Sequence, residues 1–391
     1  MSVSVPFLDL SRHVAPLKHG IKEGLSAVVD SGAFVLGPEV GRLEKTLAEY
    51  CGTKFALACA SGSEALLMAL MALDIKAGDE VIVPSFTFFA TASAVARLGA
   101  TPVFADICPD TLNIDPEDVA KKVTSRTRAM IPVHLFGRAA DMIRLQEIAE
   151  EHGIVIVEDV AQAIGAEAVM KDGQNRRVGA IGTIGCFSFY PTKNLGTMGD
   201  GGALTTDDEV LAHRLSLIRG HGMEPRYYHK LIGINGRLDA FQGLVLNQKF
   251  PFLDMWTEER QKIAEQYMML FESAFEKNPE MREVVQLPLR AGNDRMVWNQ
   301  FSICVKEAEG KEEKKVRDEL KSFLGAKKIG TEIYYPLGLH EQECFQYLNY
   351  APIDLPVTYH VSRSILALPI FPGLTCEEQE SVVEGIAEFF G

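Results

Sequence analysis

The segment EVIVPSFTFFATASAVARLGATPVFAD, residues 80–106, decides the fold class. It starts with a short apolar strand at Glu80–Pro84 and continues with a helical stretch from about Phe89 to Leu98. A second strand follows at Thr101–Asp106. Strands that are apolar on both faces and separated by helices indicate a parallel sheet that is covered on both sides. The segment therefore predicts a β–α–β unit in an α/β layered fold.

The same alternation continues on both sides of this segment, which extends the α/β prediction to roughly residues 50–250. The expected strands are Phe55–Ala60, Arg128–Val133 and Ile154–Val157, and the expected helices are Ser63–Leu73 and about Ala139–Glu151.

The pattern changes near Pro251, where a smaller α+β domain is expected. We expect two strands and three helices there, among them a strand at Val297–Val305 and helices at Trp256–Phe275, Lys311–Leu324 and Glu378–Phe390. The chain is thus divided into a large domain, residues 1–250, and a small domain, residues 251–391. A helix near Leu17–Asp30 precedes the large sheet and could pack on either domain.

Composition excludes several classes of protein. The 391 residues are 47% hydrophobic and 24% charged, close to the globular average, which rules out a fully disordered or fibrous chain. The net charge of −14 makes nucleic acid an unfavourable partner, although one small anion could still bind in a local positive pocket. No run of 18 apolar residues predicts a membrane-spanning helix.

The termini and cysteines indicate a cytoplasmic protein. The N-terminal residues lack the charged segment and apolar core of a secretory signal. The seven cysteines form no Cys-x-x-Cys pair and are odd in number, which predicts reduced thiols and no structural zinc or other metal site.

The most unusual window is residues 178–206, VGAIGTIGCFSFYPTKNLGTMGDGGALTT. It contains seven glycines and only two charged residues, Lys193 and Asp200. Burial would lower the pKa of such an isolated lysine, and a neutral amine is the nucleophile that forms a Schiff base. The alternative is a glycine-rich loop with an exposed lysine at its tip.

Two further features lie where strands are expected to end. In Ile154–Gln162 (IVIVEDVAQ) an apolar strand ends in Glu158-Asp159. A carboxylate there could hold the protonated pyridine nitrogen of a pyridoxal ring, or could simply be a structural acid or a helix cap. Phe88, just past another strand, could stack on a flat cofactor or fill the core.

The fourth feature is Ser61-Gly62-Ser63-Glu64, between a strand and a helix. Free amides at a helix start favour a phosphate, and Gly62 lets the backbone approach closely. Ser61 and Glu64 also fit an ordinary capping box. Taken together, a phosphate cradle, a stacking ring, an acid for a pyridine nitrogen and an isolated lysine predict a site for pyridoxal phosphate (PLP).

The chain as a whole resembles the DegT/DnrJ/EryC1/StrS family of PLP-dependent nucleotide-sugar aminotransferases. The resemblance implies the PLP-dependent transferase type I fold, that of aspartate aminotransferase, with a mainly parallel sheet in the large domain and a smaller α+β C-terminal domain. It is carried by motifs at residues 6–10 (PFLDL), 37–40 (GPEV), 78–88 (GDEVIVPSFTF), 132–137 (PVHLFG), 158–162 (EDVAQ), 187–194 (FSFYPTKN), 199–202 (GDGG) and 233–239 (GINGRLD).

The resemblance also implies a role for individual residues. Lys193 would form the Schiff base and carry protons, and Asp159 would pair with the pyridine nitrogen. The remaining cofactor contacts would be Gly62, Ser63, Phe88, Gln162, Ser188 and, from a second subunit, Asn235. Substrate contacts would be Arg237, also from the second subunit, with Tyr334, Tyr335 and His340 of the small domain, so a homodimer with shared sites is implied. His134 is as easily a structural residue as a catalytic one.

The implied reaction moves an amino group from L-glutamate to a keto group of a nucleotide-linked sugar, through pyridoxamine phosphate, in polysaccharide or antibiotic sugar biosynthesis. The stretch Asn235–Gln242 (NGRLDAFQ) is similar to enzymes that act at C-3, and Arg237 would suit the carboxylate of a UDP-linked 3-oxo uronate. The alternatives are a C-4 aminotransferase and a regulatory or binding protein of the same fold without turnover. Phosphate-loop and dinucleotide-binding motifs are absent, which argues against an NTPase or a dehydrogenase.

Overall fold

The computed structural model describes residues 4–290, 292, 294–307, 310 and 312–391. Its central element is a seven-stranded sheet in the order β1-β9-β8-β5-β4-β2-β3. The strands are β1 (Phe55–Cys59), β2 (Glu80–Pro84), β3 (Thr101–Ala105), β4 (Thr127–Met130), β5 (Val155–Asp159), β8 (Ile184–Ser188) and β9 (Gly202–Thr206).

The sheet confirms the prediction of an α/β fold with a mainly parallel sheet. β9 runs antiparallel to both β1 and β8, whereas the pairs from β8 through β3 are parallel. The chain reverses direction within the glycine-rich window, so β8 and β9 are joined without a crossover helix. A two-stranded hairpin, β6 (Glu167–Val169) with β7 (Asn175–Arg177), was not expected.

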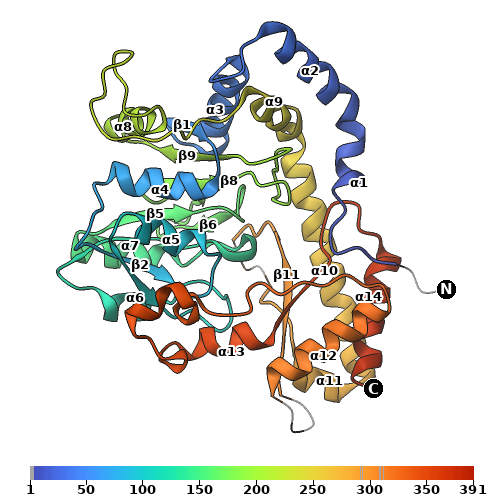
Figure 1. Cartoon of the computed structure of the whole chain (residues 1–391). Helices are drawn as coiled ribbons and strands as arrows, with labels where there is room; N and C mark the ends of the chain where they lie inside the picture. Colours follow the sequence, from blue (N-terminus) through green and yellow to red (C-terminus); the bar gives the residue numbers. More distant parts are fainter. Residues whose placement is uncertain (1–3, 291, 293, 308–309, 311) are drawn as a thin grey trace.

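Helices cover both faces of the sheet, and strand β2 shows why its sequence has no polar face. Val81 and Val83 pack on one face with α4 (Gly62–Ala72), α5 (Ala90–Arg97) and α8 (Glu209–Arg219). Ile82 points to the opposite face, which is covered by α3 (Pro38–Cys51), α6 (Pro116–Lys122), α7 (Met142–His152) and α9 (Ala240–Lys249). Burying both faces requires apolar residues at successive positions, which produces the continuous run Val81–Pro84. Figure 1 shows the helices on the two sides of the sheet.

The C-terminal part contains a second sheet, β10-β11-β12, with a core of its own. Its strands are antiparallel: β10 (Val285–Gln286), β11 (Phe301–Val305) and β12 (Ile365–Leu368). Its helices are α10 (Leu253–Lys277), α11 (Pro279–Val284), α12 (Glu313–Ala326), α13 (Pro356–Ser364) and α14 (Cys376–Phe389). The described part thus has three strands and five helices, not two and three, because β10 and β12 are too short for their pattern to stand out. Residue Lys311, where we expected α12 to begin, lies outside the described residues.

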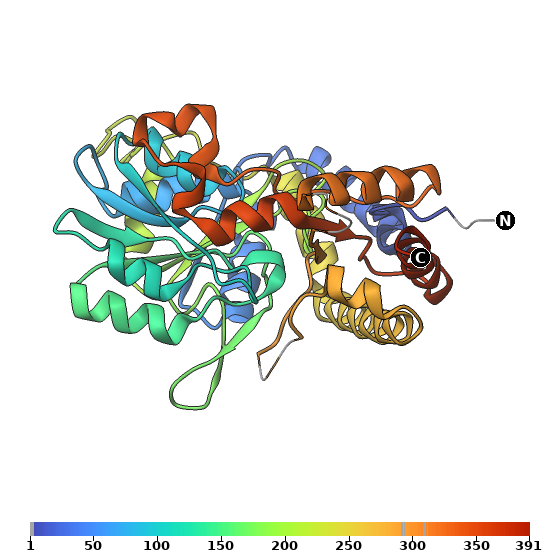
Figure 2. The same cartoon turned by 90° about the horizontal axis from the view of Figure 1, so that it is seen from below.

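The long helix α10 runs from beside α9 down through the C-terminal part (Figure 1), and Figure 2 shows it nearly end-on. Contacts cross between the two parts of the molecule at both ends of the chain. Val5 belongs to the C-terminal core, while Phe345 and Leu355 pack in the core beside the large sheet. The division into residues 1–250 and 251–391 remains a proposal.

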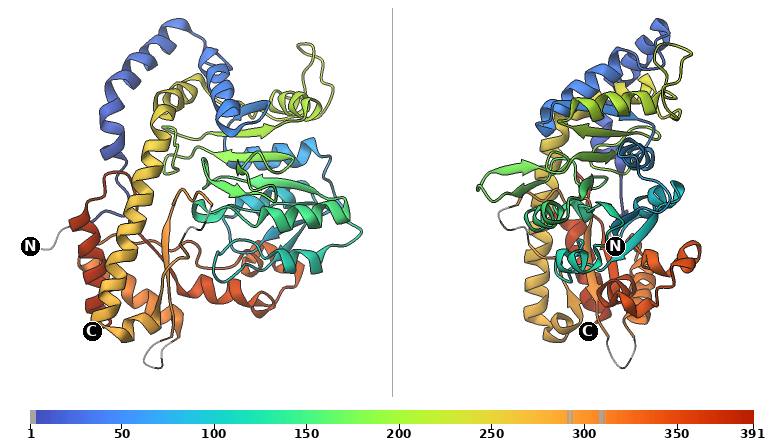
Figure 3. Two further views of the ribbon diagram at one scale, coloured as in Figure 1. Left: turned by 180° about the vertical axis from the view of Figure 1, so that it is seen from behind. Right: turned by 90° about the vertical axis from the view of Figure 1, so that its left-hand side faces the viewer.

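The N-terminal helices α1 (Leu10–Val14) and α2 (Lys18–Ser31) lead from the C-terminal part up to α3 (Figure 3). Helix α2 packs on α9, where its Val28 meets Leu244 and Ala240. The loop that follows α8 projects from the body of the molecule. No helix in the described residues is long and apolar enough to cross a membrane.

Candidate active site

The candidate site lies at the carboxyl ends of four strands that run in the same direction. Ser61-Gly62 follows β1, Phe88 lies beyond β2, Asp159 is the last residue of β5 and Ser188 is the last residue of β8. Ligands of open α/β sheets bind at this edge, because the loops there meet above the sheet. A pocket of about 640 Å³ opens there.

The structure brings together most of the residues expected in the site. The pocket is lined by nine of them: Gly62, Ser63, Phe88, Asp159, Gln162, Ser188, Lys193, Tyr334 and Tyr335. It also contains residues that the sequence analysis did not identify, namely Thr87, Tyr190, Thr192, Asp200, Gln300 and Ile333. Asp200, the second charge of the glycine-rich window, carried a signal that could have identified it.

Lys193 sits on the loop between β8 and β9, and that loop is held from both parts of the molecule. Its neighbour Asn194 donates from Nδ2 to the Val297 carbonyl (3.0 Å) and accepts from Asn299 Nδ2 (2.8 Å). The buried Lys249 donates from Nζ to the Gly196 carbonyl (2.5 Å). These hydrogen bonds hold the backbone of the loop on both sides of Asn194, while the Lys193 amine lies in the pocket.

Burial lowers the pKa of Lys193 to about 8, against the attraction of Asp159, which favours the ammonium form. Burial raises the pKa of Asp159, opposed first by the Ala161 N–H and then by Thr91 and Lys193. The Asp159 carboxylate accepts from Ala161 N–H at Oδ1 (3.1 Å) and from the Thr91 hydroxyl at Oδ2 (2.8 Å). The site therefore supplies an amine that is readily deprotonated and an oriented carboxyl group.

The start of α4 has the features of a phosphate cradle. Ser61 caps the helix by accepting from Glu64 N–H (3.1 Å), but the Glu64 side chain pairs with Arg97 (2.9 Å). The alternative capping box is thus only half formed, and first-turn N–H groups remain for a ligand. A Cβ on Gly62 would lie 2.6 Å from Ser188 Cβ, so only glycine fits where these two strands' ends converge.

The side of the pocket near the small domain is built from amide and aromatic groups. Gln162 Oε1 accepts from the Phe136 N–H (2.7 Å), which leaves its Nε2 to donate to Tyr335 Oη (3.2 Å). The Tyr335 ring lies 6.2 Å from that of Phe88, whose side chain is 58% exposed in the pocket wall. Burial raises the pKa of Tyr335, which keeps its hydroxyl protonated.

Three of the expected site residues do not line this pocket. Arg237 lines an adjoining hollow that shares Ser61 and Asp200 with it, and Asn235 is exposed nearby on the same segment. His340 is buried and does not line the pocket. Both of its ring nitrogens are hydrogen-bonded to other groups of the protein. Its Nε2 donates to the Pro352 carbonyl (3.0 Å), so Nδ1 accepts from the Ser85 hydroxyl (2.6 Å).

His134 and Glu158 form a buried pair behind the site. His134 Nδ1 accepts from Ala140 N–H (3.0 Å), so Nε2 donates to Glu158 (3.0 Å). Glu158 also accepts from the backbone N–H groups of Gly179, Ile181 and Gly182. Both side chains are fully engaged with the protein, which agrees with the structural interpretation of His134.

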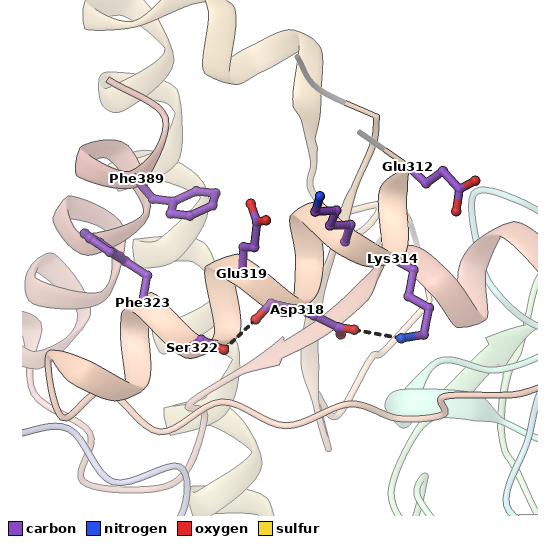
Figure 4. Close-up of a pocket in the computed structure, with 8 residues that line it drawn as sticks. Glu312, Lys314, Asp318, Glu319, Ser322, Phe323 and Phe389 are labelled. Carbon is purple, nitrogen blue, oxygen red and sulfur yellow. Dashed lines mark hydrogen bonds and ion pairs between the residues drawn. The ribbon is translucent and has the colours of Figure 1, made fainter. Parts of the chain in front are cut away.

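A second hollow, on α12, offers no comparable chemistry (Figure 4). It is a shallow surface depression in which Lys314 pairs with Asp318 (2.8 Å), and Phe323 and Phe389 lie at its far end. Among the described residues, no group of three or more His, Cys, Asp or Glu side chains is arranged to hold a metal ion.

The sheet, the pocket at its edge and the lysine–carboxylate pair define a PLP-dependent aminotransferase with the type I transferase fold. The chain belongs to the DegT/DnrJ/EryC1/StrS aminotransferase family, whose model matches residues 17–387.

Curated relatives are similar over almost their whole length. The pleiotropic regulatory protein of Geobacillus stearothermophilus is 44% identical over 99% of each chain. UDP-N-acetyl-3-dehydro-alpha-D-glucosamine 3-aminotransferase of Acidithiobacillus ferrooxidans is 39% identical over 97% of this chain and 95% of its own. UDP-2-acetamido-2-deoxy-3-oxo-D-glucuronate aminotransferase of Pseudomonas aeruginosa is 36% identical over 95% and 96%.

Solved structures agree with this assignment. DesV of S. venezuelae has a TM-score of 0.90 at 39% identity, over 99% of this chain and 98% of its own. NtdA of Bacillus subtilis, solved with bound cofactor PMP, has a TM-score of 0.89 at 30% identity, over 100% of this chain and 86% of its own.

Replacing Gly62 by alanine should weaken PLP binding to the apoenzyme about tenfold to a hundredfold. The new Cβ would lie 2.6 Å from Ser188 Cβ, and overpacking of this kind costs about 1–3 kcal/mol. Fluorescence titration of the apoenzyme with PLP measures the change. Gly41→Ala is the control, because a Cβ on this residue of α3 would meet nothing within 4 Å. Equal affinities for the two variants would contradict the cradle.

The Lys193 amine should become reactive around pH 8, not near its usual pKa of 10.5. Between pH 8 and 10.5, Lys193 is more protonated in the unfolded chain than in the folded chain. Lys193 therefore makes the stability of the apoenzyme rise with pH in this interval. Amine labelling followed by peptide mass spectrometry should show half-maximal modification of Lys193 near pH 8. In Asp159→Asn the midpoint should fall further, because the carboxylate that favours the ammonium form is gone. A midpoint near 10 would refute this environment.

Proposed function

We propose that this enzyme transfers the amino group of L-glutamate to a keto group at C-3 of a nucleotide-linked sugar, with a UDP-linked 3-oxo uronate as the favoured acceptor. The observation that carries the proposal is the Lys193–Asp159 pair in a pocket that adjoins the hollow of Arg237. Among the described residues no ion pair or hydrogen bond is recorded for the Arg237 side chain, which leaves its guanidinium for a carboxylate or a phosphate. The names of the two C-3 relatives support the position on the sugar.

The proposed roles follow from the groups in the pocket. PLP, when bound, supplies the electron sink for breaking the C–H bond of the amino donor. Lys193 Nζ takes the proton from that carbon and returns it at the neighbouring one, a task for an amine with a pKa of about 8. Asp159 holds a proton on the pyridine nitrogen, since its remaining lone pairs face the pocket.

The other pocket residues would bind and orient the cofactor and the substrate. Gly62, Ser63 and Ser188 would hold the phosphate, and Phe88 would lie against the ring. Gln162 Nε2 donates on the side of the pocket where Tyr335 lies, so it would bind the ring hydroxyl. Tyr334 and Tyr335 would contact the sugar.

We propose further that two copies share their sites, with Asn235 and Arg237 reaching the pocket of the other subunit. An apolar surface lies beside the Arg237 hollow. Phe34, Val35 and Leu36 are 44–56% exposed and Met198 is 50% exposed. Val35 pairs with Asp239 across an isolated bridge, and Met198 N–H donates to Gln242 Oε1 (2.9 Å), so these residues surround the hollow. Such a surface is typical of an interface between subunits.

Mixed dimers test the shared site. Lys193→Ala should be inactive when alone, and Arg237→Ala should convert the uronate only weakly at a concentration below the wild-type KM. Random mixing of the two should restore about a quarter of wild-type activity, because half the dimers are hybrids and one site of each hybrid is intact. No recovery on mixing, with hybrid formation verified by two affinity tags, would show that Arg237 acts within its own subunit.

A substrate panel tests the reaction itself. Purified enzyme is incubated with glutamate and UDP- or dTDP-linked 3-oxo and 4-oxo sugars, with and without a C-6 carboxylate, and 2-oxoglutarate is measured. The proposal expects the highest kcat/KM for the 3-oxo uronate. Arg237→Ala should raise KM for the uronate more than for the matching neutral sugar. Preference for a 4-oxo sugar would move the reaction to C-4.

The Geobacillus relative is named a regulatory protein, which suggests a second candidate function: binding of a ligand without turnover. Lys193 in the pocket favours catalysis, since a protein that only binds needs no amine with a depressed pKa there. Binding of PLP with no conversion of glutamate to 2-oxoglutarate would support the regulatory function.

A further inference from the structure

Thr91 is a buried residue whose hydroxyl contacts the proposed catalytic acid. It lies in the first turn of α5 and is fully buried. Its Oγ1 donates to Asp159 Oδ2 at 2.8 Å, and the other oxygen, Oδ1, accepts from Ala161 N–H at 3.1 Å. Thr91 does not line the pocket, so it touches the acid from behind.

The backbone of Asp159 is already fixed without Thr91. Its N–H donates to the Pro132 carbonyl (2.9 Å) and its carbonyl accepts from His134 N–H (3.0 Å). The only freedom left is rotation of the carboxyl group about its side-chain bonds. Two donors on the two oxygens set that rotation and leave the outer lone pairs toward the pocket.

The direction of the Thr91 hydrogen bond also bears on the charge of the acid. An ionised carboxylate only accepts hydrogen bonds, and the Thr91 hydroxyl has a single proton to give. Thr87, four residues earlier in the loop between β2 and α5, has its Oγ1 3.4 Å from that of Thr91. When the Thr91 proton is donated to an ionised Asp159, Thr87 donates in that weaker contact, so the two hydroxyls form a chain that matches the ionised acid.

We propose that Thr91 is a positioning residue that holds the Asp159 carboxylate ionised and turned toward the pyridine nitrogen of the cofactor. The inference rests on the role proposed above for Asp159. The segment Thr87–Thr91 would then have two roles. Phe88 would lie against the cofactor ring, and the Thr91 hydroxyl would orient Asp159.

Isosteric and conservative variants separate the hydroxyl from the shape of the side chain. Thr91→Val keeps the shape and loses the donor, and Thr91→Ser keeps the donor. Thr257→Val is the matched control, because Thr257 is equally buried and its hydroxyl donates to the Leu253 carbonyl within α10 (3.0 Å). Four quantities are measured for each: the PLP affinity of the apoenzyme, kcat and KM with glutamate, and the thermal stability of the apoenzyme.

Thr91→Val should bind PLP about tenfold to a hundredfold more weakly, the usual range for loss of a hydrogen bond to a charged group. Its kcat should fall by a similar factor with KM for glutamate little changed, while Thr91→Ser and Thr257→Val remain close to wild type. In an Asp159→Asn background most of the effect of Thr91→Val should vanish, because Thr91 acts through the charge of the acid and the amide carries none.

Three results would overturn the proposal: wild-type PLP affinity and kcat in Thr91→Val, equal damage in Thr91→Ser, or a full effect of Thr91→Val in the Asp159→Asn background. PLP affinity and the glutamate half of the reaction involve no sugar. These measurements would therefore remain interpretable if the sugar assignment were wrong. A negative result for Thr91 would likewise not change the interpretation of the sugar panel.

Discussion

Lys193→Ala should abolish transamination while leaving the fold intact. Loss of a nucleophile that also carries the proton is expected to lower kcat by about 10⁴–10⁶-fold. The variant should lose the visible absorption band that PLP gives when bound to the wild-type enzyme. Borohydride reduction of the wild type should attach the cofactor to the peptide containing Lys193.

The stability of this variant separates a catalytic role from a structural one. Burial lowers the pKa of Lys193 to about 8, so its charge is held at a cost and its removal should not lower the melting temperature of the apoenzyme. Lys315→Ala, at an exposed lysine on α12, is the control and should keep full activity and the absorption band. Turnover by Lys193→Ala above about one hundredth of wild type would exclude Lys193 as the central residue of the site.

Asp159→Asn should lower kcat at least about a hundredfold, far more than it changes stability. The amide retains the shape and the hydrogen bond from Thr91 but cannot balance a protonated ring nitrogen, which weakens the electron sink. The loss should appear in both half-reactions, since both need the same sink. Stopped-flow conversion of the pyridoxal form with glutamate, and of the pyridoxamine form with the keto sugar, measures it.

The stability of the Asp159→Asn apoenzyme should be equal to or higher than that of wild type at neutral pH. Burial raises the folded-state pKa of Asp159 above its unfolded value, so the folded chain holds more protons at this residue than the unfolded chain in that interval. Whatever stability the residue contributes is therefore lost as the pH rises through the folded-state pKa. Asp172→Asn, at an exposed turn residue, controls for the loss of one charge. Normal turnover by Asp159→Asn would show that the acid assignment is wrong.

Local sequence pattern was sufficient for the elements of the large sheet. EVIVP at β2 and the run ending in Asp159 at β5 are apolar because both faces are buried, and that requirement acts residue by residue. The pattern was weaker in the C-terminal part. β12, with the sequence ILAL, follows α13 without a break, so no turn residue marked its start.

The chemistry of the site was partly visible for the same local reason. Lys193 stood out because a glycine-rich window with so few charges is unusual for a surface loop, and Asp159 because an acid ended an apolar strand. Thr91 carried no such signal, since a threonine in an alanine-rich helix is unremarkable until Asp159 is placed beside it. The burial of His340 beside the pocket carried no sequence signal, because its partner Ser85 is 255 residues away in the chain.

The sequence by itself determined that the chain forms an α/β enzyme and predicted which lysine and acid would carry its chemistry, because burial and charge constrain each residue type separately. Only the tertiary structure decided that β9 turns back antiparallel, that loops after β1, β2, β5 and β8 meet in one pocket, and that Arg237 lies in the hollow beside it. The physical reason is that strand order is set by hydrogen bonds between segments far apart in the chain, and no local pattern encodes those partners.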